Sequence, residues 1–181
     1  MDRDTRENET RRHRIGRAFR RVSREYSPQE EHRLAGHLGA LVAFGVYTAA
    51  WGTAIGMRKP ELSGQHRPTD ILFTAAAVFR LGRLLSKGSV TSPLRAPFTQ
   101  YEAATGPAEV KESPRGGPIR STVGELVTCP FCLSVWLTTT FTSAHLLWPA
   151  ATRTVTGGLT ALALADTVQL GYDSLTQKNA E

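Results

Sequence analysis

The sequence has little cysteine and little lysine, and two long stretches contain no charged residue. Only two of the 181 residues are cysteine, which excludes the disulfide-rich class of small secreted proteins. Residues 34–57 and 126–152 contain no Asp, Glu, Lys or Arg. About 20 apolar residues span a bilayer as a helix, and soluble core helices seldom stay uncharged for that length. The pattern therefore predicts a membrane protein and excludes both a soluble globular protein and a disordered one.

The charge pattern predicts how often the chain crosses the membrane. We predict an all-α polytopic membrane protein with about four transmembrane helices and an N-terminal basic amphipathic helix. With the N-terminus inside, four crossings place 18 of the 22 Lys and Arg residues on the cytoplasmic side, as the positive-inside rule requires. The predicted location is a bacterial inner membrane, with both termini cytoplasmic. The predicted segments are a tail (1–33), a first span (34–57), a membrane domain (70–172) and a short tail (173–181). Within the membrane domain we predict three further spans, at 70–86, 127–149 and 154–172, and a proline-rich cytoplasmic loop at 87–125.

The first 33 residues carry ten arginines and no lysine. Ile15, Phe19, Val22 and Tyr26 recur at helical spacing among those arginines, which predicts a basic amphipathic helix on an anionic lipid surface. A solvated tail that only fixes orientation is the alternative. Nucleic acid is not favoured, because no known binding fold frames the arginines. The residues expected to contact lipid headgroups are Arg11, Arg12, Arg14, Arg17, Arg20, Arg21 and Arg24.

A stripe of small residues runs along the first span and includes Gly52 and Gly56, four positions apart. Such stripes let two helix backbones approach closely within a bilayer. We expect this stripe to pack within the same chain, with a homodimer through Gly52 and Gly56 as the alternative.

The sharpest local motif is Cys129-Pro130-Phe131-Cys132. Proline suits the first position of a helix, which places Cys129 at the helix cap and Cys132 in the first turn. The N-terminus of a helix favours a thiolate, so the pair is a candidate for redox chemistry. It could also supply half of a zinc site, which a dimer or histidines would complete. A structural pair without chemistry is the third interpretation. We assign no catalytic residue and no cofactor.

Two opposite charges lie within the predicted spans. Arg80 is ten residues beyond Asp70, and Asp166 is twelve residues into its own helix. At about 1.5 Å per residue, both lie about 15–18 Å from the outer ends of their helices. Unpaired charges inside a bilayer are costly, so we predict that Arg80 and Asp166 form an ion pair, with an ion path as the alternative.

Three ordered motifs lie between residues 70 and 171: Phe79-Arg80-Leu81-x-Arg83-Leu84, Pro93-Leu94-Arg95-x-Pro97-Phe98 and Gly124-Glu125-Leu126-x-x-Cys129-x-x-Cys132-x-x-x-Trp136. With these motifs, the segment resembles a bacterial membrane family catalogued as domain of unknown function 1360. The resemblance implies an integral membrane protein and supplies no reaction and no catalytic residues. We therefore favour a non-enzymatic interaction or structural component with unknown protein partners, with a membrane thiol-redox protein and a metal-binding membrane dimer as alternatives.

Overall fold

A computed structural model describes residues 31–58 and 67–178 of the chain. The arginines expected to contact lipid, between Arg11 and Arg24, lie outside these residues, so that expectation stays a prediction. The chain divides into two compact units, residues 1–43 and 44–181. All contacts discussed below belong to the second unit.

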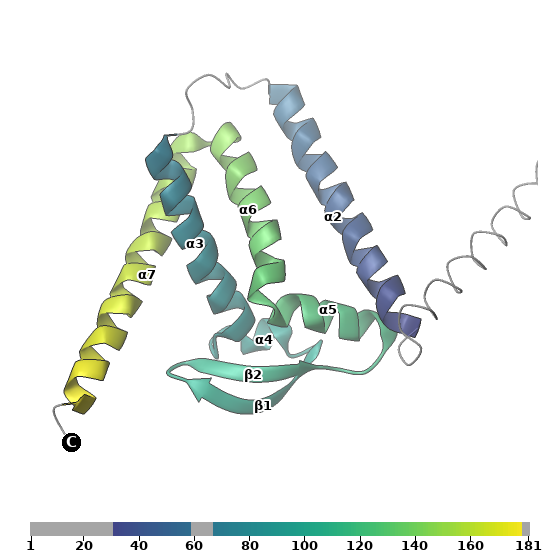
Figure 1. Ribbon diagram of the computed structural model, residues 1–181. Coiled ribbons are helices and arrows are strands. Elements are labelled where there is room, and N and C mark those ends of the chain that lie inside the picture. Colours follow the sequence, from purple (N-terminus) through teal and green to yellow (C-terminus); the bar gives the residue numbers. More distant parts are fainter. Residues whose placement is uncertain (1–30, 59–66, 179–181) are drawn as a thin grey trace, which may run out of the picture. The chain divides into compact units, whose positions relative to one another are not determined.

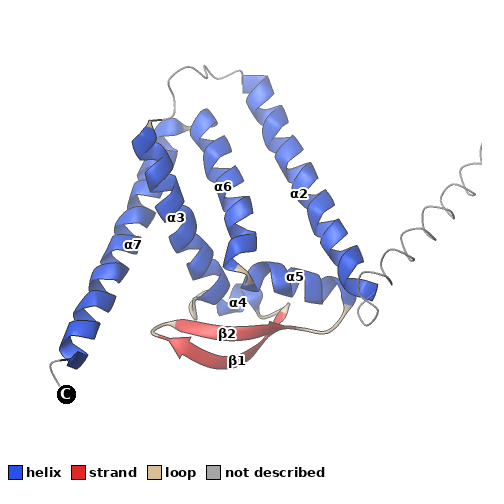
Figure 2. Ribbon diagram, viewed as in Figure 1, coloured by secondary structure: helices blue, strands red, loops and turns tan. Residues whose placement is uncertain are grey.

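The described residues are mostly helical, with one small sheet (Figures 1 and 2). The expectation of an all-α fold is wrong in that respect, because two strands pair within the segment predicted as a loop. The elements are α2 (Glu31–Arg58), α3 (Pro68–Lys87), α4 (Ser92–Arg95), β1 (Thr99–Gly106), β2 (Glu109–Pro114), α5 (Pro118–Thr128), α6 (Pro130–Leu147) and α7 (Pro149–Lys178).

Helices α3, α6 and α7 pack side by side, with α3 contacting both others (Figure 1). Helices α3 and α7 run in the same direction, because residues near their starts pair with each other and residues further along do the same. Helix α6 runs the opposite way, since Gly82 near the end of α3 faces the Pro130 carbonyl at the start of α6. Ala77, Val78 and Phe141 form the small apolar core between them.

Strands β1 and β2 form an antiparallel hairpin, which corrects the prediction that 87–125 is a loop. The prolines exclude a long helix, but they suit this hairpin because they lie at its edges. Pro97 precedes β1, Pro107 lies in the turn and Pro114 ends β2. Ala108 in the turn has a φ of 60°, a conformation uncommon for residues other than glycine. We call residues 88–128, which hold α4, the hairpin and α5, the hairpin module.

The predicted third span, 127–149, does not begin as one continuous helix. Helix α5 ends at Thr128, helix α6 begins at Pro130, and the two axes differ by 78°. Cys129 between them has φ −97° and ψ 107°, which is extended backbone. Proline disfavours the helical conformation for the residue before it, so the chain breaks at Cys129.

By length and apolar composition, one described helix could cross a membrane, Leu34–Arg58, and the bent pair α5 and α6 would raise that number to two. Helices α3 and α7 do not meet this test, because charged residues and threonines interrupt both. The expectation of four spans therefore has no support from helix length and composition alone.

Candidate functional site

Polar side chains join α3, α6 and α7 at the end where α3 begins. The buried carboxylate of Asp70 accepts two hydrogen bonds from the guanidinium of Arg153, at 3.0 and 3.1 Å. It also accepts one from the backbone N–H of Arg67, at 3.0 Å. The Nε2 atom of His145, itself buried, lies 3.6 Å from the same carboxylate. One carboxylate thus fastens the starts of α3 and α7 to the end of α6.

Further along the same two helices, Arg80 of α3 contacts Asp166 of α7 through its Nε atom. The structure therefore brings together the two residues that the depth argument paired. Both side chains are partly shielded, with 22% and 35% of their surfaces exposed. Together with Asp70 and Arg153, this contact gives α3 and α7 two ion pairs of opposite polarity, which fix their register.

A third ion pair connects α3 to the hairpin module. Arg83 donates from Nε and Nη2 to the two carboxylate oxygens of Glu109 in β2, at 3.0 and 2.7 Å. Such bidentate pairs fix the relative orientation of the two side chains as well as the distance between them. The start of β2 is therefore held directly against the last turns of α3.

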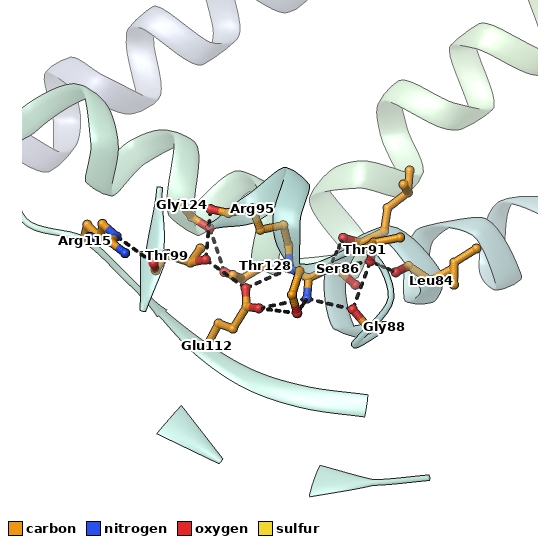
Figure 3. Close-up of polar contacts among 12 residues, drawn as sticks. Leu84, Ser86, Gly88, Thr91, Arg95, Thr99, Glu112, Arg115, Gly124 and Thr128 are labelled. Carbon is orange, nitrogen blue, oxygen red and sulfur yellow. Dashed lines mark hydrogen bonds and ion pairs between the residues drawn. The ribbon is translucent and has the colours of Figure 1, made fainter. Parts of the chain in front are cut away.

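Arg95 lies at the centre of the hairpin module, with only 2% of its surface exposed (Figure 3). It donates to the backbone carbonyls of Leu85 and Gly88, at 2.7 and 2.9 Å. These carbonyls belong to the end of α3, where four carbonyls lack partners within the helix. Arg95 also donates twice to Glu112 of β2, at 2.8 and 3.0 Å. One side chain thus closes the end of α3 and binds it to the hairpin.

The Glu112 side chain is nearly as buried as that of its partner, with 5% of it exposed. Its carboxylate accepts further hydrogen bonds from the hydroxyls of Ser92 and Thr99, each at 2.9 Å. Burial raises the pKa of Glu112, but the hydrogen bonds from Arg95, Thr99 and Ser92 outweigh it and bring the pKa below its ordinary value. The pair is therefore charged at neutral pH and well provided with hydrogen bonds.

The hairpin packs against α5 at Gly124. A Cβ atom at this position would lie 2.7 Å from the carbonyl oxygen of Phe98 and 2.9 Å from the Cβ of Pro114. Only glycine allows so close an approach between helix and hairpin. The hairpin module is therefore one packed unit rather than a loose loop.

Cys129 and Cys132 lie at the break between α5 and α6, and both are free thiols. Cys129 caps α6 and its sulfur accepts a hydrogen bond from the backbone N–H of Cys132, at 3.2 Å. Pro130 occupies the start of α6, as the sequence predicted. In the described part of the chain, no group of three or more His, Cys, Asp or Glu residues could hold a metal ion.

Among the described residues nothing packs closely against the glycines of the α2 stripe, which corrects the expectation of packing within this part of the chain. A Cβ atom added at Gly45, Gly52 or Gly56 would meet no atom within 4 Å. Helix α2 instead contacts α6 through side chains, since the Tyr47 hydroxyl lies 2.6 Å from that of Thr140.

Comparison with known proteins places this fold in a family. The family described as protein of unknown function (DUF1360) matches residues 72–172, more than half of the chain. The chain belongs to DUF1360. Sporulation protein YjcA of Bacillus subtilis (strain 168) is 36% identical over 69 residues, which cover 36% of this chain and 58% of that protein. The chain thus matches little more than half the length of this relative. No solved structure matches the chain.

The DUF1360 segment contains the Arg80–Asp166, Arg83–Glu109 and Arg95–Glu112 pairs, whereas Tyr47 and Asp70 precede it. Sequence analysis of this segment missed Arg95 and Glu112 as a pair, because they lie 17 residues apart on elements that it did not predict. One signal was available, a lone arginine among apolar residues from Pro93 to Pro97. Gly52 and Gly56 precede the DUF1360 segment.

Proposed function

We propose that this protein is a non-enzymatic component of a bacterial inner membrane, in which α2, α3, α6 and α7 cross the bilayer. The hairpin module lies on the cytoplasmic side, where it presents a rigid surface for interaction. The arginine-rich tail before residue 34 adds contacts with anionic lipid headgroups.

The distribution of buried residues carries this proposal. In the described part of the chain, nine buried residues are polar or charged and four are hydrophobic, while 23 large hydrophobic residues are exposed. A water-soluble domain buries its hydrophobic residues, whereas a bilayer solvates exposed apolar side chains. The apolar exteriors of α3, α6 and α7 therefore favour a lipid environment for all three helices. Buried polar residues on the two later helices are Ser143, His145, Thr152, Thr156 and Thr160.

Pairing of the charges supports the crossing of α3 and α7, which length and composition alone do not support. Arg80 neutralises Asp166, and Arg153 neutralises Asp70, so neither helix presents an unpaired charge at these positions. An intramembrane charge costs less when it meets a partner inside the helix bundle.

Alternating helix directions agree with four crossings. Tyr47 contacts Thr140, and the guanidinium of Arg58 lies 4.9 Å from the centre of the Trp148 ring. Helices α2 and α6 therefore run in the same direction, opposite to α3 and α7. Each connection then reverses the chain at one surface, and the hairpin module, with its four Lys and Arg residues, falls on the cytoplasmic side.

Proteolysis between α2 and α3 tests this proposal on the full chain. A site for a specific protease is inserted within residues 59–66, and the protease is added outside intact protoplasts. We expect cleavage, with the fragment from residue 67 onward retained in membranes washed at alkaline pH. Release of that fragment by the wash would leave α2 as the anchor and overturn the proposal.

A homodimer through Gly52 and Gly56 is our proposal for a partner. The space around both glycines, which no described residue fills, supports it, because a second helix can approach there. Leucine at both positions should weaken self-association in detergent, whereas Gly171→Leu on α7, an equally open glycine, should not.

A thiol-redox protein is the second candidate function. The position of two free thiols at the start of α6 favours it, because Cys-x-x-Cys pairs at helix N-termini are typical of thiol-redox proteins. Zinc binding by the same pair would need two ligands from a second copy. Measured zinc content and a redox titration of the purified protein separate these two alternatives.

A further inference from the structure

The segment around α4 has its polar side chains inside and its apolar side chains outside. Thr91, Ser92, Arg95 and Thr99 face inward and make the hydrogen bonds of the buried network. Apart from the half-buried Phe98, the residues beside and between them are apolar and exposed. Val90 is 78% exposed and Leu94 is 69% exposed, and Pro93, Ala96 and Pro97 are exposed as well.

Hydrogen bonds hold this segment at the level of the last turn of α3. The Thr91 hydroxyl donates to the carbonyl of Leu84, at 2.5 Å, and Arg95 donates to those of Leu85 and Gly88. The chain therefore folds back after α3 instead of extending into solvent (Figure 3). The apolar face of residues 90–97 lies beside the end of a proposed membrane helix.

We propose that the apolar face of residues 90–97 inserts into the headgroup region of the bilayer that α3 crosses. This inference rests on the proposed function, because the end of α3 marks the membrane surface only if α3 spans. Exposed large apolar side chains beside the end of such a helix match the mixed environment at the boundary of headgroups and acyl chains. Lys87, the last residue of α3, is placed to meet a lipid phosphate at the same depth.

The proposed contact of residues 90–97 with the membrane gives the buried pair of Arg95 and Glu112 a further role. Arg95 and Glu112 keep the polar side of the segment inside, so the apolar side must face outward. The hairpin module is then held against the membrane by residues 90–97 as well as by the end of α3. A loop tethered only at its ends would lack this fixed orientation.

Fluorescence quenching in vesicles tests the inference on the full chain. Leu94→Cys is made in a background of Cys129→Ser and Cys132→Ser and labelled with an environment-sensitive fluorophore. Val135→Cys on α6, 52% exposed, is the control for lipid contact, and Tyr101→Cys on β1, 67% exposed, is the control for water. Vesicles of phosphatidylethanolamine and phosphatidylglycerol carry either a nitroxide lipid or no quencher, and iodide is added from the water.

We expect the Leu94 probe to be quenched by the nitroxide lipid and to resist iodide several-fold better than the Tyr101 probe. Iodide quenching of Leu94 equal to that of Tyr101, with Val135 still quenched by lipid, would overturn this inference alone. Resistance of the Leu94 probe to both quenchers would also overturn it, because protein would then cover the face. A Val135 probe that lipid does not quench would instead contradict the proposed function.

Discussion

Arg95 and Glu112 form an ion pair in the interior of the hairpin module, with 2% and 5% of their side chains exposed. The guanidinium reaches the carboxylate with two hydrogen bonds, and its remaining donors satisfy carbonyls at the end of α3. The pair therefore connects a helix to a strand that follows it by more than 20 residues. Loss of Glu112 would leave the buried charge of Arg95 unpaired, and loss of Arg95 would leave both the Glu112 carboxylate and the carbonyls of Leu85 and Gly88 without this partner.

Glu112→Gln should destabilise the hairpin module by about 3–5 kcal/mol, because removal of the carboxylate leaves the charge of Arg95 unpaired in the interior. The matched control is Glu102→Gln, which breaks the exposed pair with Lys111 on the same hairpin. That variant should be indistinguishable from wild type. Hydrogen exchange of peptides from residues 99–114 measures the stability of the hairpin in both variants. Equal protection of these peptides in the two variants would contradict the role of the buried pair.

Acid should weaken the module through the same carboxylate. Hydrogen bonds hold the pKa of Glu112 below its ordinary value of 4.5, despite the opposing effect of burial, so folding favours the charged form. The stabilisation is therefore fully present above pH 4.5 and is lost as the pH falls through the lowered pKa. The difference in thermal midpoint between wild type and Glu112→Gln should shrink as the pH falls below 4.5. A difference that stays constant with pH would refute this assignment.

Arg80→Ala or Asp166→Ala should lower the yield of folded protein in detergent, since each change leaves one partly shielded charge between α3 and α7 unpaired. The exchange of Arg80→Asp together with Asp166→Arg should recover part of that loss. Membranes of each variant are solubilised in the same detergent, and size-exclusion chromatography measures the yield of folded protein. Single variants that behave like wild type would show that the contact does not stabilise the fold.

The positions of α2 and α6 and the cap of α6 could be predicted from the sequence, because they depend on local signals, whereas α7 (Pro149–Lys178) begins before and ends after the predicted span 154–172. Uncharged stretches located α2 and α6, and Pro130 located the start of α6. The contact between Arg80 and Asp166 followed from depth along two helices, which needs only the rise per residue.

Long-range pairing could not be predicted in the same way. Strand β1 pairs with β2 through backbone groups, and its side chains are exposed except for Thr99, so no apolar alternation marks it. Asp70 and Arg153 meet across 83 residues, and no spacing in the sequence indicates that contact. The prolines of 87–125 were correctly taken to exclude a long helix, but they are equally compatible with a loop and with a hairpin.

Alkylation should distinguish the two thiols. Cys129 should react faster with iodoacetamide than Cys132, because its sulfur accepts a backbone N–H and it lies at the cap rather than inside α6. Both should be recovered as free thiols from cells quenched with acid, since a reducing cytoplasm disfavours a disulfide. Peptide mass spectrometry measures both properties, and equal rates for the two thiols would remove the basis of the redox proposal.

The central claim is that four helices cross the membrane and leave the hairpin module in the cytoplasm. Its most direct measurement is the labelling of single cysteines on intact protoplasts with a membrane-impermeant maleimide. Ser63→Cys, between α2 and α3, and Tyr101→Cys, on β1, are each made in a background without native cysteines. The account predicts labelling at position 63 from outside, and labelling at position 101 only after the membrane is opened. Labelling of position 101 from outside would contradict it.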